Sequence, residues 1–285
     1  MPSPATRLRG LLAGPDFLPM PCCFDALSAK LIEQAGFALT FMSGFAVAAT
    51  RLALPDTGLI SYGEMVEQGR DITAAVSIPV LADGDTGYGN VMNVKRTVDG
   101  YARAGFACIM IEDQLSPKRC GHVAGKLVVE RGAALSRVRA AVDAREEGAD
   151  LLVMARTDAR ATHGLEEALW RCQAFADLGV DIIFLEAPQS RQEMQQFCDQ
   201  VRGVKMANMV EGGRTPLLPP GELESLGYKI AAYPLTLLAA AAQAMQDALR
   251  NLRVGVPVER GMDFERLKEI VGFGRYAEEE KRYRE

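Results

Sequence analysis

Short apolar runs recur along the chain, and each is followed by polar residues and then by a stretch in which apolar positions have helical spacing. Nearly continuous apolar runs of this length are typical of strands that are buried on both faces of a parallel sheet. Glycines such as Gly36 and Gly105 close the helical stretches, where a C-terminal cap is expected. Eight runs fit the description of a strand: residues 21–24, 39–42, 78–82, 108–111, 151–155, 182–185, 204–207 and 229–232.

Strands that alternate with helices predict a parallel sheet with helical crossovers, and therefore an α/β fold. Eight repeats with polar residues after each strand favour a (β/α)8 TIM barrel, whose active site lies at the carboxyl ends of the strands. An open doubly wound sheet is the alternative, but Phe24-Asp25-Ala26, rather than a G-x-G-x-x-G fingerprint, follows the first run. No linker marks a second domain, so we interpret residues 1–285 as one barrel domain, with an appended helix over the charged segment 264–285.

The composition excludes several classes of protein. The chain of 285 residues is 48% apolar and 24% charged, which is typical of a folded protein, and its net charge of -5 with no basic stripe argues against nucleic-acid binding. Six cysteines without a C-x-x-C spacing favour reduced thiols in a cytoplasmic protein over a disulfide framework or structural zinc. Because no apolar stretch approaches the roughly 20 residues of a membrane span, we expect no membrane association.

Four acidic residues fall at or just beyond the ends of neighbouring predicted strands: Asp56, Asp83, Asp85 and Glu112. Strand ends that are neighbours in a barrel are close in space, so these carboxylates are expected to converge. Several carboxylates at close range do not all stay ionised without a cation, and oxygen ligands that act partly through water suit Mg²⁺, or alternatively Mn²⁺, better than Zn²⁺. For Asp56 alone, a helix cap or a solvated loop carboxylate is an equally good interpretation.

A polar loop at residues 117–122, which we call the cysteine loop, reads Pro-Lys-Arg-Cys-Gly-His. Lys118, Arg119 and His122 flank Cys120, and neighbouring cations are expected to lower the pKa of a thiol below its free value of about 8.5. Cys120 is therefore a candidate proton donor or nucleophile on a segment that closes over a substrate. The alternative is a basic surface loop in which the cysteine has no role.

Motifs throughout residues 20–250 carry a resemblance to a known family. They include Ser43-Gly44, Leu54-Pro55-Asp56, the D-G-D-T-G-Y-G-N turn that begins at Asp83, the cysteine loop, and Ala155-Arg156-Thr157-Asp158. With these motifs in this order, the chain resembles the isocitrate lyase/phosphoenolpyruvate mutase superfamily. The resemblance implies a (β/α)8 barrel that exchanges its last helix with a partner subunit, a homotetramer built as a dimer of dimers, bound Mg²⁺, and 2-oxo acid chemistry.

The cysteine loop distinguishes branches of this superfamily. Its carbon–carbon lyases are similar to K-[KR]-C-G-H there, with the cysteine as catalytic acid, whereas phosphonate mutases and hydrolases typically carry asparagine or another residue. Gly125-Lys126 and residues 208–216 look more like 2,3-dimethylmalate lyase, petal death protein and oxaloacetate hydrolase. Phe41 stands where 2-methylisocitrate lyases carry a tyrosine that is implicated in catalysis, which makes a tricarboxylate substrate less favoured.

The reaction that the resemblance implies is a Mg²⁺-dependent retro-aldol cleavage of a 2-hydroxy (alkyl)malate-type di- or tricarboxylate to a 2-oxo acid and a carboxylate. The alternatives are a 2-methylisocitrate lyase, an oxaloacetate hydrolase or decarboxylase, and an enzyme similar to carboxyphosphonoenolpyruvate phosphonomutase. A phosphonate enzyme leaves Cys120 without a function. A non-catalytic protein on a decayed barrel predicts gaps in the acidic cluster or in the cysteine loop, and the sequence has neither.

Roles for individual residues follow from this interpretation. We expect Cys120 to protonate the carbanion, with Lys118, His122, Arg156 and Glu186 as further catalytic candidates. Arg156 is alternatively a structural ion-pair partner of Asp158 or Glu186, and Glu186 is either an acid–base group or a buried partner. Substrate binding is expected from Arg156 together with the backbone N–H groups of Ser43, Gly44 and Phe45, and from Asn208, Glu211 and Thr215. The shape of the pocket near Phe45, Met209, Leu217 and Pro234 is expected to select the substituents of the substrate.

Overall fold

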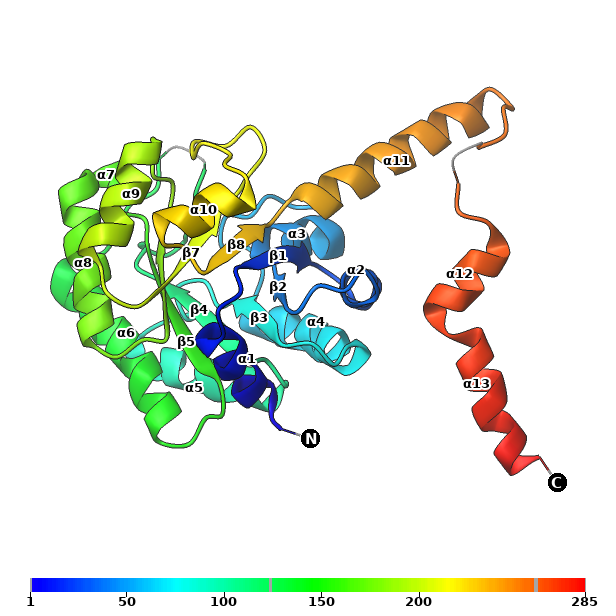
Figure 1. Ribbon diagram of the computed structural model, residues 1–285, viewed down its shortest axis with the longest axis horizontal. Helices are drawn as coiled ribbons and strands as arrows, with labels where there is room; N and C mark the ends of the chain where they lie inside the picture. The colour runs from blue at the N-terminus through cyan, green and yellow to red at the C-terminus, as the bar shows by residue number, and fades with distance from the viewer. Residues whose placement is uncertain (1, 123–124, 259–260, 285) are drawn as a thin grey trace. The chain divides into compact units, whose positions relative to one another are not determined.

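A closed barrel of eight parallel strands, hydrogen-bonded in the order β1 to β8, forms the body of the protein (Figure 1). The structure is a computed structural model that describes residues 2–122, 125–258 and 261–284. The chain divides into two compact units, Met1–Thr236 and Leu237–Glu285, and the first contains the whole barrel. The predicted α/β barrel is therefore confirmed.

Each predicted run overlaps one strand, because each strand of the barrel is covered on both faces and reads as an apolar run. The strands are β1 (Leu18–Cys23), β2 (Thr40–Met42), β3 (Val80–Asp83), β4 (Cys108–Glu112), β5 (Leu152–Thr157), β6 (Ile182–Leu185), β7 (Val204–Asn208) and β8 (Ile230–Tyr233).

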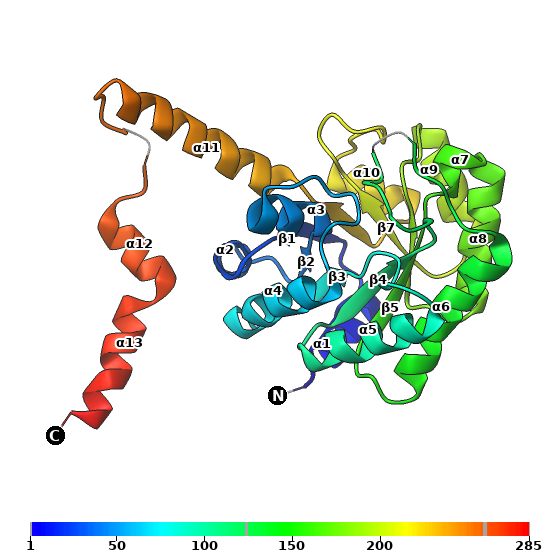
Figure 2. The same cartoon turned by 180° about the vertical axis from the view of Figure 1, so that it is seen from behind.

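Helices follow the strands and surround the barrel, as both views show (Figures 1 and 2). Side-chain caps set several of their starts: Asp25, Ser61 and Asn90 each accept a backbone N–H of the first turn of the helix that follows. The helices of the first unit are α1 (Pro4–Ala13), α2 (Ala26–Gln34), α3 (Gly44–Val47), the π-helical turn η1 (Ala48–Leu52), α4 (Tyr62–Ala75), α5 (Val91–Arg103), α6 (Arg131–Glu146), α7 (Ala159–Thr162), α8 (Leu165–Asp177), α9 (Arg191–Gln200) and α10 (Pro220–Leu226).

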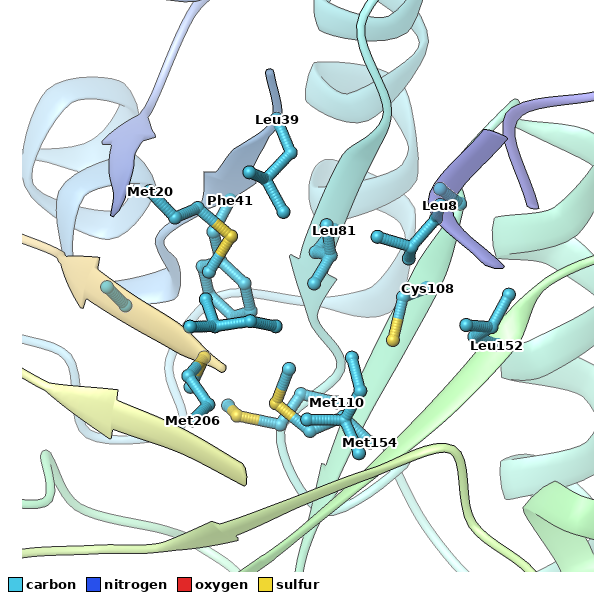
Figure 3. Packing of buried hydrophobic residues seen from close by; sticks show 14 of the residues in the cluster. Leu8, Met20, Leu39, Phe41, Leu81, Cys108, Met110, Leu152, Met154 and Met206 are labelled. Carbon is cyan, nitrogen blue, oxygen red and sulfur yellow. The ribbon is translucent and has the colours of Figure 1, made fainter. Parts of the chain in front are cut away.

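The interior of the barrel is a packed core whose residues come from alternate positions of the strands (Figure 3). Helix α1, which the sequence pattern did not predict, belongs to this core through its fully buried Leu8. Leu8 belongs to the same core cluster as Cys108 and Leu152, the first residues of β4 and β5 (Figure 3). Helix α1 therefore covers the amino end of the barrel and leaves the carboxyl end for a site.

The second unit consists of α11 (Thr236–Arg253), α12 (Phe264–Val271), α13 (Phe273–Glu280) and the short η2 (Lys281–Tyr283). The prediction of a single appended helix over residues 264–285 is wrong, because α12 and α13 are separate helices. The helix is interrupted at Gly272, whose left-handed backbone (φ 91°) donates its N–H to the carbonyls of Lys268 and Glu269 and so ends α12. Across the described residues, no helix is long and apolar enough to cross a membrane.

The packing of α1 generates a prediction for stability. We expect Leu8→Ala to lower the free energy of unfolding by about 3 kcal/mol, because it removes a fully buried side chain and leaves a cavity under the barrel. Urea denaturation measures this change, with Arg9→Ala on the exposed side of the same helix as the matched control. Equal stability of the two variants would show that α1 does not belong to the cooperative core.

Candidate active site

A cavity of about 90 Å³ lies inside the first unit at the carboxyl ends of the barrel strands. Its floor is the top of the barrel core, and its walls come from the loops that follow the strands. The cysteine loop lines it with Lys118, Arg119, Cys120, Gly121 and His122. The other lining residues are Cys22, Phe41, Ser43, Phe45, Asp56, Asp83, Met110, Arg156, Phe184, Glu186, Met206, Asn208, Val210, Ala232, Pro234 and Leu235.

The four carboxylates predicted to hold a metal are all buried: Asp56, Asp83, Asp85 and Glu112. Asp83 ends β3, and Asp85 lies in the tight turn that follows this strand. The Asp85 N–H donates a hydrogen bond to Asp83 Oδ1 at 3.0 Å. Asp85 has a positive φ of 47°, which is uncommon for a residue other than glycine and is part of this turn. Asp56 and Asp83 line the cavity, while Asp85 and Glu112 are not among its lining residues.

Lys118 provides the positive charge at this acidic end. Its Nζ is 2.5 Å from Asp56 Oδ1 and 2.8 Å from Asp85 Oδ1, and the side chains of all three residues are almost fully buried. Asp56 Oδ1 and Asp85 Oδ1 nevertheless lack a hydrogen bond of normal geometry within the described residues, and so does Glu112 Oε1. Three buried carboxylate oxygens are therefore left with incomplete bonding.

The same imbalance appears in the pKa values. Burial raises the pKa of Asp85 to about 7; Lys118 opposes this shift, and Asp83 and Asp56 add to it. Burial likewise raises the pKa of Glu112 well above its usual value, against the charge of Arg156. A divalent cation fits these donors, because it would satisfy the oxygens and restore the ionised forms. Among the described residues, however, no three His, Cys, Asp or Glu side chains are grouped so that they could hold a metal ion on their own.

Arg156 forms ion pairs with three acidic side chains. Its Nε is 2.8 Å from Asp158 Oδ2 and 3.3 Å from Glu112 Oε2, and its Nη2 is 3.1 Å from Glu186 Oε2. Arg156 also lines the cavity, so the two interpretations left open by the sequence are compatible. It is an ion-pair partner of both Asp158 and Glu186, and its remaining surface faces the space where a ligand would lie.

His122 is oriented by two hydrogen-bonding neighbours. Its Nδ1 accepts the backbone N–H of Arg214 at 3.1 Å, so Nε2 carries the proton and lies 3.2 Å from Glu186 Oε1. Burial alone would raise the pKa of Glu186, but Arg156 and His122 outweigh burial and hold that pKa well below its usual value. Glu186 is thus an ionised partner of the arginine and the histidine, and Asn208 Nδ2 lies within 3.3 Å of its Oε2.

The expectation of a lowered pKa for Cys120 is wrong. Burial raises the pKa of this thiol, the backbone N–H of His122 lowers it in part, and the charge of Asp56 raises it further. The flanking cations do not act as the sequence predicted, because Lys118 is paired with Asp56 and Asp85, while His122 faces Glu186. At neutral pH the thiol therefore keeps its proton, as a proton donor must.

The helix start at Ser43 also requires a correction. The Ser43 N–H donates to the Cys23 carbonyl at 3.1 Å and is used within the barrel, so it is not a donor for a ligand. Gly44 and Phe45 begin α3 and remain the candidates from this helix start. Gly44 lies so close to Asp83 Oδ2 that any larger side chain would overlap it, which explains the glycine at this position.

The loop after β7 contributes less to the cavity than predicted. Glu211 is exposed and accepts the Thr236 hydroxyl at 2.5 Å, and neither it nor the buried Thr215 lines the cavity. Met209 is buried in the packing outside the barrel and Leu217 is 53% exposed, so neither shapes the cavity either. Phe45 and Pro234 do line it, as expected.

The comparison with known proteins agrees with these motifs. A family model described as phosphoenolpyruvate phosphomutase matches residues 8–253. The 2,3-dimethylmalate lyase of Eubacterium barkeri is 42% identical over 284 residues, which cover 98% of this chain and 98% of the relative. This chain belongs to the phosphoenolpyruvate phosphomutase family.

Solved structures of the family have the same fold. An oxaloacetate acetylhydrolase in complex with the inhibitor 3,3-difluorooxalacetate matches with a TM-score of 0.94 at 34% identity, over 98% of this chain and 96% of that chain. A phosphonopyruvate hydrolase in complex with oxalate and Mg²⁺ matches with a TM-score of 0.87 at 30% identity, over 99% of each chain. The chain is thus an enzyme of the isocitrate lyase/phosphoenolpyruvate mutase superfamily, to which the similar 2,3-dimethylmalate lyase belongs.

Residues outside the cavity lining also support the site of this family member, and most of them were not among the predicted site residues. The Gln114 side chain accepts the Arg119 N–H at 2.9 Å and donates to the Arg119 carbonyl at 2.8 Å, which anchors the cysteine loop. Lys126 Nζ lies 2.6 Å from Asp158 Oδ1. These polar side chains are identified by their burial. The sequence of a loop does not show which of its side chains are buried.

The environment of Cys120 generates a prediction on reactivity. We expect the rate of Cys120 alkylation by iodoacetamide to keep rising with pH beyond the midpoint of an ordinary cysteine, because burial disfavours the thiolate. Mass spectrometry of the Cys120 peptide at a series of pH values measures the rate, and the urea-unfolded protein, with a midpoint of about 8.5, is the reference. A plateau below pH 8 in the folded protein would contradict the expectation.

Proposed function

We propose that this enzyme cleaves the C2–C3 bond of a 2-hydroxy (alkyl)malate-type dicarboxylate by Mg²⁺-dependent retro-aldol chemistry, as a 2,3-dimethylmalate lyase does. The products are a 2-oxo acid and a carboxylate. One observation carries the proposal: a protonated thiol, Cys120, lines a cavity together with Arg156, Asp56 and Asp83, and Lys118 of the same lining is paired with the undercompensated Asp85. The similarity to the 2,3-dimethylmalate lyase over almost the whole chain supports it.

The residues divide the work between binding and proton transfer. Arg156 and the N–H groups of Gly44 and Phe45 would hold the carboxylate and the C2 oxygen of the substrate. Asp56, Asp83, Asp85 and Glu112 would hold Mg²⁺, or alternatively Mn²⁺, partly through water. A bound divalent cation supplies a Lewis acid beside the C2 oxygen. The Mg²⁺ in the related phosphonopyruvate hydrolase complex supports this choice of cofactor.

The bond cleavage leaves a charge that Cys120 is placed to neutralise. A water molecule in the cavity would take the proton of the substrate hydroxyl and pass it to solvent, the C2–C3 electron pair moves into the departing carboxylate fragment, and C2 becomes a carbonyl carbon. Cys120 then donates its proton to C3 of the departing fragment and becomes a thiolate. Its raised pKa favours this direction of transfer, because the proton is present before the reaction and the thiolate is a stronger base than usual afterwards. Glu186 stays ionised, so we assign it to orienting Arg156 and His122 rather than to donating a proton.

The cavity favours a small substrate with apolar substituents. Its small volume of about 90 Å³ supports a dicarboxylate over the larger tricarboxylate methylisocitrate. Phe41, Met110 and Phe184 form an apolar floor without a hydroxyl group. Oxaloacetate hydrolysis and phosphonate chemistry remain the alternatives, because enzymes of both kinds share this fold.

We also propose self-association as a homotetramer in which the helix after the barrel is exchanged between subunits. Helix α11 has no buried residue, and its apolar Met245, Leu249 and Leu252 are each more than half exposed. Leu27 and Leu31 of α2 are 46% and 38% exposed. Apolar faces of this kind call for a covering surface.

All six cysteines are free, which supports the cytoplasmic location expected from the sequence.

The activity is tested with a panel of 2,3-dimethylmalate, other alkylmalates, methylisocitrate, oxaloacetate and a phosphonate, each with Mg²⁺. We expect release of a 2-oxo acid from an alkylmalate, and we expect Cys120→Ser to lower kcat by roughly 10²- to 10⁴-fold through loss of the proton donor. Cys198→Ser, which changes a half-buried cysteine outside the cavity, is the control. Turnover of the phosphonate alone, with Cys120→Ser fully active, would overturn the lyase proposal.

The metal site is tested by thermal unfolding, without turnover. Saturating Mg²⁺ or Mn²⁺ is expected to raise Tm by roughly 5 °C, because the ion binds only the folded protein. Asp85→Asn should remove this rise, whereas Asp150→Asn on the exposed surface should preserve it.

The same variant tests the direction of the Asp85 pKa shift. A folded pKa of about 7 lies above the unfolded value of about 3.9, so the metal-free protein loses stability as the pH rises from about 4 to about 7, and the full loss is present above pH 7. Metal-free Asp85→Asn should therefore unfold at pH 8 at the same temperature as the unmodified protein or higher. A full metal-dependent rise in Asp85→Asn would show that Asp85 does not help to bind the ion.

A further inference from the structure

Lys126 is a buried lysine just after the cysteine loop, and the mechanism above does not use it. Its side chain is only 2% exposed, and its Nζ lies 2.6 Å from Asp158 Oδ1. The same Nζ donates to the backbone carbonyl of Gly121, within the cysteine loop. Lys126 is not among the residues that line the cavity, so it does not touch a ligand there.

Asp158 connects Lys126 to the arginine of the site. Its Oδ2 accepts Arg156 Nε at 2.8 Å, and its Oδ1 accepts Arg156 Nη2 at 3.1 Å as well as Lys126. The Asp158 backbone is fixed in turn, because its N–H donates to Asp113 Oδ1 at 3.0 Å. One fully buried carboxylate therefore fixes both the substrate-holding arginine and the lysine that binds the cysteine loop.

The peptide that Lys126 binds packs closely against the side chains of the site. Gly121 packs directly against Arg156 and Glu186, and a Cβ atom at this position would overlap both side chains. On the other side of Cys120, Gln114 binds both the N–H and the carbonyl of Arg119. Cys120 is thus held between two anchored peptides, one bound by an amide and the other by an ammonium group.

We propose that Lys126 is a positioning residue that holds the Gly121 peptide against Asp158 and so places the Cys120 thiol over the cavity when the loop is closed. A merely structural lysine needs no partner in the loop that carries the reactive thiol. The loop carbonyl supplies one acceptor for this buried ammonium, and because a buried charge needs its hydrogen bonds, the closed loop is favoured over an open one. The role in catalysis rests on the proposed function of Cys120, but the role in closure does not.

Closure is measured by the protection of Cys120 from iodoacetamide in the presence of Mg²⁺ and oxalate. We expect oxalate to slow Cys120 alkylation about tenfold in the unmodified protein and to have little effect in Lys126→Met, which lacks the donor. Lys126→Arg keeps a cationic donor and should retain part of the protection. Cys198, half-buried and away from the cavity, provides the reference rate in the same digest. Full protection of Cys120 in Lys126→Met would overturn the proposal.

Kinetics with an alkylmalate separates positioning from general stability. Lys126→Met is expected to lower kcat about 100-fold and to leave KM within about threefold, because a displaced proton donor affects the chemical step rather than substrate binding. Lys205→Met is the matched control, since Lys205 is also buried and also donates to a backbone carbonyl, that of Gly203, at the start of β7. Equal losses of kcat in the two variants, or a rise in KM without a fall in kcat, would contradict the positioning role.

Thermal unfolding of both variants shows whether each is folded, and Lys126→Gln provides a second, polar replacement should Lys126→Met fail to fold. The two proposals fail separately. Loss of protection in Lys126→Met without cleavage of any 2-hydroxy acid by the unmodified protein rejects the proposed function and leaves the closure role intact. Cleavage that depends on Cys120, with protection unchanged in Lys126→Met, rejects the closure role alone.

Discussion

Four buried carboxylates at the carboxyl end of the barrel impose the constraint on which the rest of the site depends. Charge removed from water must be compensated nearby, and the compensation here is uneven. Around Glu186, the charge of Arg156 and the hydrogen bond from His122 hold the pKa of the carboxyl well below its usual value and keep it ionised. Around Asp85, the single ammonium of Lys118 does not offset burial, and the pKa rises to about 7. The negative charge of Glu186 is thus compensated, whereas the carboxylates around Asp85 still lack positive charge. We therefore expect a cation to bind near Asp85 and an anionic substrate group to lie near Arg156.

The same burial determines what Cys120 can do. Its sequence neighbours include cations, yet in the folded chain Lys118 is paired with Asp56 and His122 faces Glu186, and burial, together with the charges of Asp56 and Glu186, raises the pKa of the thiol. A thiolate would be suited to nucleophilic attack, whereas a thiol that keeps its proton until a carbanion forms is suited to acid catalysis. The correction to the pKa therefore strengthens the interpretation of Cys120 as a proton donor. It also shows why adjacency in sequence is a poor guide to charge in a buried loop.

The strands and the first layer of the site could be predicted from the sequence, because both depend on local patterns. A strand covered on both faces reads as an apolar run, and the residue that ends it reaches the active face, as Asp83, Glu112 and Asn208 do. Helix α1 escaped prediction because its buried residues meet core residues that are distant in sequence, such as Cys108. Gln114 and Lys126 escaped for a similar reason. A glutamine that binds a loop peptide and a lysine that binds Asp158 look like ordinary polar loop residues until the chain is folded.

The floor of the cavity links substrate choice to the stability of the barrel. Phe41, Met110 and Phe184 point into the barrel from three strands, where they complete the core and at the same time form the surface on which a substrate would rest. A smaller side chain at any of them would enlarge the space for substituents, but it would also open a cavity in a close-packed interior. Loops such as the cysteine loop are free of this conflict, because their residues face the ligand without filling the core. Chemistry is therefore able to diverge through the loops of this fold, whereas the size of the substrate is constrained by the packing that holds the barrel together.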